Sequence, residues 1–209
     1  TIGKGIVPIS DLEGNMPVYV AMVSSMAAFV WVLIATALKM PISTSHSIVG
    51  AVAGAGLAIG APVCWRKLVD VFICWVVTPL GAAVIAYVLY FILKHTFHRV
   101  VPDRIAGRVL ALLIVLSGCY VAFTWGANDV ANAVGVIAGS GRLSVRMSLV
   151  LGSAAILLGV VTWGYKVIET IGSNIVQMLP LMAFSAQLAS SINVHVYTVM
   201  GVPVSTSHS

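Results

Sequence analysis

The heptapeptide Pro41-Ile42-Ser43-Thr44-Ser45-His46-Ser47 returns almost unchanged as Pro203-Val204-Ser205-Thr206-Ser207-His208-Ser209. Each copy directly follows a long apolar run. A second match lies upstream of each copy, between Thr1 to Val7 and Thr170 to Val176. A hydroxyl-rich stretch that is repeated within apolar sequence indicates a functional site in a duplicated membrane protein. We therefore expect part of a duplicated membrane protein, with the first copy cut at its start and the second cut at its end.

The composition indicates an integral membrane protein. Hydrophobic residues make up 60% of the chain and charged residues only 8%, and the mean hydropathy is +1.06. A β-barrel would alternate apolar and polar residues over about ten positions at a time, and this chain does not. Its apolar runs are instead near or above the roughly 17 to 25 residues that a spanning helix needs. These runs are Met16 to Leu38, Leu68 to Leu93, Val109 to Trp125, Met147 to Tyr165 and Ile175 to Val202.

Two shorter runs, Ile48 to Val63 and Val130 to Gly139, are rich in Gly and Ala and lie beside polar motifs. We expect them to form half-helices or re-entrant segments, which a bilayer tolerates only where they are buried in protein or line a wet cavity. The predicted fold is thus all-α: a polytopic helical bundle with inverted repeats and broken or re-entrant helices.

Basic residues are concentrated between two of the predicted spans. Lys94, Arg99, Arg104 and Arg108 lie there with His95 and His98, and only Asp103 opposes them. The positive-inside rule places this predicted loop in the cytoplasm. The net charge of +5 therefore reflects topology and contact with anionic lipid headgroups. Nucleic acid is not an expected partner, because the basic residues are not interleaved with aromatic residues on a solvated face.

The block from Gly126 to Gly135 places a carboxylate and two carboxamides inside an otherwise apolar stretch. An acid within the membrane costs at least about 2.5 to 3.5 kcal/mol and indicates a functional site. On a helix, Asn128, Asp129 and Asn132 can converge on one cavity. Such oxygens suit a hard cation such as sodium, or a proton relay. The structural alternative is hydrogen bonding between helices.

The repeated heptapeptide predicts an anion site. Pro41 and Pro203 cannot continue a preceding helix, so the hydroxyl residues after them can begin a new one. A helix N-terminus offers free N–H groups and partial positive charge, and the hydroxyls add donors. Two copies facing each other would hold one tetrahedral oxyanion from both sides. His46 and His208 could donate to the anion, sense protons, or simply fix the backbone. Ser and Thr bonding back to the helix at a proline kink is the structural alternative.

These blocks together resemble the signatures of the inorganic phosphate transporter (PiT) family. The resemblance covers nearly the whole chain and implies symport of phosphate with sodium or protons, through two inverted repeats. It assigns cation binding to Asn128, Asp129 and Asn132. Substrate binding would involve Ser43, Thr44, Ser45, Asp129, Asn132, Ser205, Thr206 and Ser207, with His46 and His208 as accessory residues. The first repeat lacks its Asn-Asp-x-x-Asn block here, and Ala155-Ile156-Leu157 stands where some members carry a glutamate, so sodium and proton coupling both stay open.

The charge of Asp129 favours phosphate over sulfate. Phosphate at neutral pH keeps one or two protons, so a P–OH group can donate to the carboxylate, whereas sulfate has no proton to offer. A cation or proton on Asp129 would cancel this preference, so sulfate or a related oxyanion remains the alternative substrate. Cation binding before the anion would neutralise the acid and raise anion affinity.

We expect residues 1–47 to end the first repeat, 48–108 to hold connecting helices and the basic loop, and 109–209 to form the truncated second repeat. The expected protein lies in the cell membrane as a multi-pass transporter, with the lipid bilayer and a second copy of the chain, in a homodimer, as further partners. We expect no cofactor, no resident metal and no chemical reaction. A Ser/His hydrolase is disfavoured because each cluster places Ser and His too close on one segment, and His195 is expected to pack or to hydrogen-bond between helices.

Overall fold

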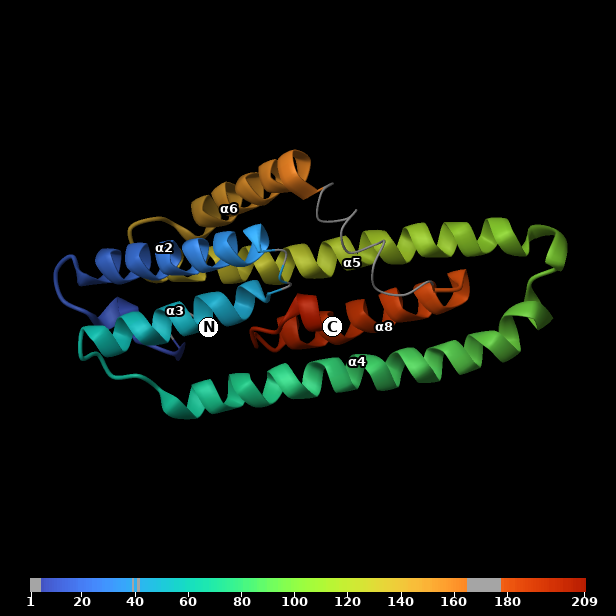
Figure 1. Cartoon of the computed structure of the whole chain (residues 1–209), viewed down its shortest axis with the longest axis horizontal. Coiled ribbons are helices and arrows are strands. Elements are labelled where there is room, and N and C mark those ends of the chain that lie inside the picture. Colours follow the sequence, from blue (N-terminus) through green and yellow to red (C-terminus); the bar gives the residue numbers. More distant parts are fainter. Residues whose placement is uncertain (1–4, 39, 41, 165–177) are drawn as a thin grey trace.

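The structure is a helical bundle built around one long hairpin. The computed structural model describes residues 5–38, 40, 42–164 and 178–209, and these contain no β-strand. The two hairpin helices, α4 (Trp65–Val100) and α5 (Asp103–Gly139), are joined only by Val101 and Pro102. α8 (Pro180–Val199) lies between them and contacts both (Figure 1). The predicted all-α fold class is therefore confirmed.

The remaining helices pack on the half of α5 that is farther from the hairpin tip (Figure 1). α2 (Met16–Ala37) contacts both α3 (Thr44–Ala58) and α5, and α6 (Val145–Gly159) packs on α5 from a further side. Three short pieces complete the described chain. They are the 3-10 turns η1 (Ile9–Asp11) and η3 (Thr206–His208) and the π-helical turn η2 (Val160–Gly164).

Within the described residues, four helices are long and apolar enough to cross a membrane, which confirms a multi-pass membrane protein. They are α2, α4 over Trp65–Phe97, α5, and α6 with its extension to Thr162. The fifth predicted span, over Ile175 to Val202, corresponds to α8, which has 20 residues but is not among these four. Its hydropathy is lowered by polar side chains such as Gln187, Asn193 and His195.

The predicted short segments have different outcomes. α3 has 15 residues and is thus about 22 Å long, less than the hydrocarbon core of about 30 Å. The helical part of the predicted run, Ile48 to Ala58, therefore belongs to a helix too short to cross this layer, and its re-entrant placement stays a prediction. The prediction for Val130 to Gly139 was wrong, because these residues continue α5 without a break. No proline interrupts this part of α5, and neighbouring elements bind its polar side chains.

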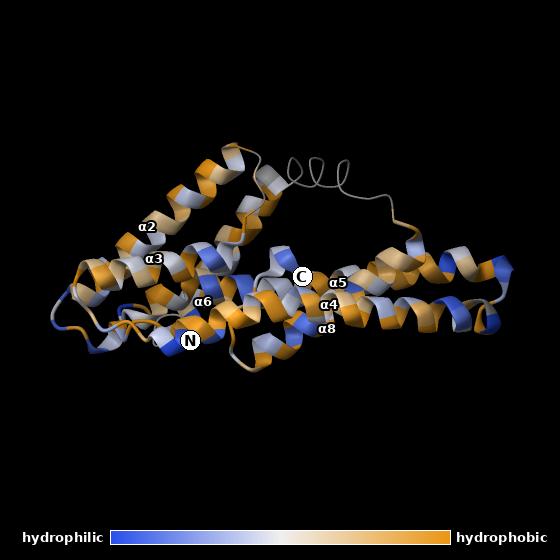
Figure 2. Cartoon of the chain, turned by 60° about the horizontal axis from the view of Figure 1, so that its bottom comes forward, coloured by the Kyte–Doolittle hydropathy of each residue, from blue (hydrophilic) through white to orange (hydrophobic). Residues whose placement is uncertain are grey.

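The prediction that the basic residues form a loop was also wrong, since these residues are helical. Lys94 and Arg99 lie in the last turns of α4, and Arg104 and Arg108 lie in the first turns of α5. With 37 residues, α5 is about 55 Å long, which exceeds the hydrocarbon core by roughly 25 Å. The tip of the hairpin is hydrophilic whereas its length is mainly hydrophobic (Figure 2). The basic side chains thus have room outside the apolar layer, and their cytoplasmic placement remains a prediction.

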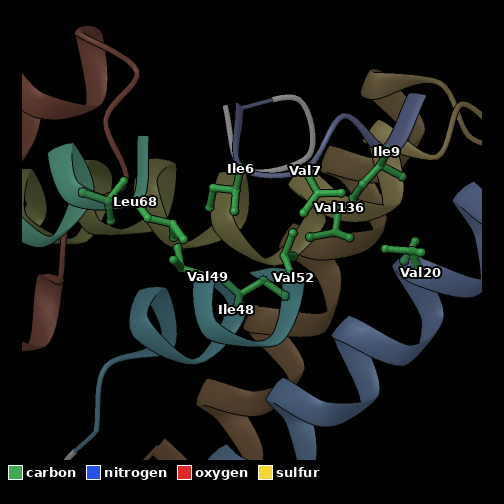
Figure 3. Packing of buried hydrophobic residues seen from close by; sticks show 11 residues of the cluster. Ile6, Val7, Ile9, Val20, Ile48, Val49, Val52, Leu68 and Val136 are labelled. Carbon is green, nitrogen blue, oxygen red and sulfur yellow. The ribbon is translucent and has the colours of Figure 1, made fainter. Parts of the chain in front are cut away.

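A hydrophobic cluster fixes α3 against the rest of the bundle (Figure 3). Ile48, Val49 and Val52 of α3 pack there, and each is at most 6% exposed. The other members come from the N-terminal segment, α2, α4 and α5, and are Ile6, Val7, Ile9, Val20, Ala21, Leu68, Val71 and Val136. Because α3 begins with the first heptapeptide, this cluster also sets the position of that motif.

Candidate functional site

The first heptapeptide begins α3. Ser43 has an extended backbone and is the N-cap of the helix, and its hydroxyl accepts a hydrogen bond from the backbone N–H of His46 at 3.3 Å. The hydroxyl of Ser47 donates to the carbonyl of Ser43 at 2.9 Å. The hydroxyl residues therefore start a new helix, as predicted. Pro41, whose predicted break precedes them, lies outside the described residues.

The second heptapeptide follows the end of α8. That helix ends at Val199, and Gly201 then takes a φ of +71°, a left-handed conformation that glycine adopts without strain. Pro203, Val204 and Ser205 are not helical, and η3 follows as a single turn. The predicted helix break before this copy is thus present.

The two heptapeptides contact each other directly. Ser45 donates to the carbonyl of Val204 at 2.6 Å, and Ser207 donates to the carbonyl of Ile42 at 3.3 Å. The rings of His46 and His208 also meet edge to face, with their centroids 4.9 Å apart. Two segments about 160 positions apart in the chain therefore lie side by side at this candidate site.

The Asn-Asp block of α5 joins both copies at this site. Asn132 donates to the hydroxyl of Ser45 at 2.8 Å and also to the carboxamide oxygen of Asn128 at 2.8 Å. On the other side, the hydroxyl of Thr206 lies 3.3 Å from each carboxylate oxygen of Asp129. The structure thus brings together the three motifs that the sequence singled out.

Burial divides the predicted substrate residues into three groups, and Asp129 alone has intermediate burial. Ser43, Ser45, Asn132, Ser205 and Thr206 are at most 5% exposed. Thr44 and Ser207 are exposed.

Two polar atoms at the site are buried without a hydrogen-bond partner among the described residues: the hydroxyl oxygen of Ser205 and Nε2 of His46. A buried polar group without a partner costs about 1–3 kcal/mol, so these atoms are the natural contacts of a polar ligand. In contrast, the hydroxyl of Ser45 already donates one bond and accepts another.

A pocket of about 280 Å³ opens beside the heptapeptides. Its wall includes residues of both copies and a tryptophan of α2, and it is formed by Trp31, Ile42, Ser43, His46, Ser47 and His208. A larger hollow of about 560 Å³ lies along α2 and is lined only by apolar or aromatic side chains. The smaller pocket is therefore the one suited to a polar ligand.

A seam of polar side chains between α5 and α8 was missed at the sequence level. Asn128 donates to Thr198 at 3.3 Å, Tyr120 pairs with His195 at 3.1 Å, and Ser117 donates to Gln187 at 2.6 Å. The α5 members recur every three or four residues when Thr124 is included, so helical periodicity could have revealed the seam. The prediction that His195 bonds between helices is confirmed.

No group of three or more His, Cys, Asp or Glu side chains that could hold a metal ion occurs in the described part of the chain. An alkali cation would instead take single carboxylate, carboxamide and hydroxyl oxygens. Asp129 and Thr206 place carboxylate and hydroxyl oxygens 3.3 Å apart between α5 and the second heptapeptide.

Comparisons with known proteins show the family to which the chain belongs. The model of the phosphate transporter family matches residues 1–209. A Pyrococcus furiosus protein named as a phosphate permease is 26% identical over 288 residues, covering 100% of this chain and 70% of the relative. A Helicobacter pylori protein (strain J99), also named as a phosphate permease, is 27% identical over 291 residues, covering 99% and 55%. A solved structure titled "The sodium-dependent phosphate transporter" matches with a TM-score of 0.86 and 26% identity, covering 100% of this chain and 72% of that one. The chain therefore belongs to the phosphate transporter family.

Proposed function

We propose that the protein is a symporter that moves inorganic phosphate across the membrane together with sodium. The observation that carries this proposal is the contact of both heptapeptides with the Asn-Asp block of α5. Three polar motifs from distant parts of an apolar chain meet there, which a structural scaffold would not require. The name of the matched solved structure favours sodium over protons as the coupling ion.

The anion would be held by hydroxyl and N–H donors. The first turn of α3 presents backbone N–H groups with partial positive charge. The buried hydroxyl of Ser205 has no other partner among the described residues, and Ser43 and His46 line the neighbouring pocket. These groups would donate to the bare oxygens of phosphate from both copies of the motif.

Asp129 gives this anion site its selectivity. Its carboxylate accepts a hydrogen bond from the hydroxyl of Thr206. It would also accept a hydrogen bond from a P–OH group of phosphate. Sulfate at neutral pH has no such proton and would meet uncompensated negative charge. The carboxylate therefore favours a protonated oxyanion.

The same carboxylate would couple the anion to sodium. Asn132 makes both of its hydrogen bonds through its amide nitrogen, which leaves its carboxamide oxygen to coordinate a cation beside Asp129. A sodium ion bound there would neutralise Asp129 and raise the affinity for phosphate. By thermodynamic linkage, phosphate would raise the affinity for sodium by the same factor.

The test is uptake of labelled phosphate by the full-length protein in proteoliposomes, with sodium or potassium outside. We expect sodium-dependent uptake that is lost in Asp129→Asn, because the variant has no charge to bind the cation. Asp103→Asn, at the start of α5 and far along the helix from the site, is the matched control and should retain uptake.

Competing anions and pH separate the remaining outcomes. Excess sulfate should leave phosphate uptake unchanged. Uptake of sulfate in place of phosphate would overturn the proposed substrate. Uptake that follows a proton gradient and ignores sodium would overturn the proposed coupling ion.

A further inference from the structure

Trp75 of α4 contacts the first heptapeptide although it belongs to none of the signature motifs. Its ring centroid lies 3.7 Å from that of His46, with 37° between the ring planes. A second ring neighbour of His46 is His208, at 4.9 Å. The imidazole of His46 thus contacts both a tryptophan of α4 and the histidine of the second heptapeptide.

Both His46 and Trp75 carry a buried polar atom that makes no hydrogen bond within the described structure. Nε2 of His46 and Nε1 of Trp75 are each buried, and neither has a hydrogen-bond partner among the described residues. His46 also lines the pocket of about 280 Å³. A ring held in place without a hydrogen bond must be held by its packing.

The backbone of His46 is fixed as well. Its N–H donates to the N-cap hydroxyl of Ser43, so the helical turn cannot shift without breaking the cap. The ring contacts with Trp75 and His208 then restrict the remaining freedom, which is rotation of the side chain. His46 is therefore preorganised at the pocket wall, and the contact with Trp75 is the part supplied by α4.

α4 is weakened at the turn that carries Trp75. Pro79 lies four residues further along the helix and has no N–H to donate to the carbonyl of Trp75. One residue earlier, the carbonyl of Thr78 accepts a hydrogen bond from Asn193 of α8 at 2.8 Å. The indole of Trp75 thus lies in the turn of α4 that precedes Pro79, next to the point where α8 hydrogen-bonds to α4.

We propose that Trp75 is a positioning residue for anion binding, which holds the imidazole of His46 against the pocket wall. This inference rests on the proposed function. Ordering a free side chain on binding lowers affinity, and one such side chain corresponds to about a two- to tenfold change. Loss of the indole should therefore raise the KM for phosphate by about this factor and leave kcat nearly unchanged.

The test compares Trp75→Phe with Trp75→Leu in the full-length protein, by initial rates of phosphate uptake in proteoliposomes. Trp75→Phe keeps an aromatic ring and should have a KM close to that of the unmodified protein. Trp75→Leu fills the space without a ring and should show the raised KM. Trp65→Leu is the matched control, because Trp65 is an exposed tryptophan at the start of the same helix. Trp75→Met provides a second ring-free variant if Trp75→Leu does not fold.

A double-mutant cycle distinguishes positioning from general damage to the bundle. In a His46→Ala background, Trp75→Leu should have no further effect on KM, because the ring that Trp75 positions is gone. An equal loss in both backgrounds, or an unchanged KM in folded Trp75→Leu and Trp75→Met, would overturn the inference. If the unmodified protein takes up no phosphate, the proposed function itself fails, and this outcome is distinct from the previous two.

Discussion

Ser45 donates a hydrogen bond to the backbone carbonyl of Val204 over 2.6 Å, although 159 positions separate them in the chain. The same hydroxyl accepts a hydrogen bond from Asn132. One fully buried side chain thus links the first heptapeptide to the second and to the Asn-Asp block of α5. This places Ser45 at the junction of the three motifs, and makes its hydroxyl less available to a substrate than that of Ser205.

Ser45→Ala should therefore destabilise the protein as well as reduce transport. It removes two buried hydrogen bonds and leaves the amide of Asn132 with one partner fewer, which costs about 1–3 kcal/mol. Thermal unfolding of the purified protein in detergent measures this effect. Thr44→Ala is the matched control, because Thr44 is the exposed neighbour and should change the midpoint little. Equal midpoints for the two variants would contradict the linking role of Ser45.

Thr206→Val tests the contact between the second heptapeptide and the acid of α5. The change keeps the size of the side chain and removes the hydroxyl that lies 3.3 Å from both oxygens of Asp129. A hydrogen bond to a charged group contributes about 1.5–3 kcal/mol, so we expect at least a tenfold loss of sodium-dependent uptake. Thr206→Ser keeps the hydroxyl and should retain most uptake. If Val and Ser behave alike, the hydroxyl is not what matters.

Much of the fold could be predicted because bilayer physics leaves few choices. The long apolar runs correspond to α2, α4, α5 and α6. The predicted and observed ends differ by only a few residues in most cases. The extent of α5 could not be predicted, since hydropathy falls at Asn128 to Asn132 while the helix continues. A polar block breaks a hydropathy window, but it breaks a helix only if its side chains lack partners. Those partners, Ser45, Thr198 and Thr206, lie on segments far away in the chain.

The sequence could predict which residues belong to the candidate site, but not how these residues contact one another. Repetition identified Ser43 to Ser47 and Ser205 to Ser209, and the cost of a charge in the membrane identified Asp129. Neither signal indicates that the hydroxyl of Ser45 is already hydrogen-bonded within the protein. Nor does either indicate that the hydroxyl of Ser205 has no partner among the described residues. Trp75 carried no sequence signal at all, because a tryptophan in an apolar run is the ordinary case.

Tyr120→Phe and His195→Leu test whether the seam between α5 and α8 is a stabilising contact. The two side chains pair at 3.1 Å, and hydrogen bonds between membrane helices contribute about 0.6 kcal/mol on average. Each single variant and the double variant should be unfolded thermally in detergent. The double variant should lose less than the sum of the two single losses, since one bond is removed in all three cases. Additive losses would mean that the pair contributes no coupling.

Gly56→Ala and Gly54→Ala form a matched pair that tests the packing of α3. A Cβ atom at Gly56 would lie 2.5 Å from Cγ2 of Val7, and Val7 is fully buried in the hydrophobic cluster. At Gly54, two residues earlier on the same helix, a Cβ atom would meet nothing within 4 Å. Alanine favours a helix over glycine by up to about 1 kcal/mol, so Gly54→Ala should raise the unfolding midpoint slightly. Gly56→Ala should lower it, because overpacking a core costs about 1–3 kcal/mol. Because α3 carries the first heptapeptide, Gly56→Ala should also reduce phosphate uptake, whereas Gly54→Ala should not. A Gly56→Ala protein as stable and active as Gly54→Ala would show that the N-terminal segment does not fix the position of α3.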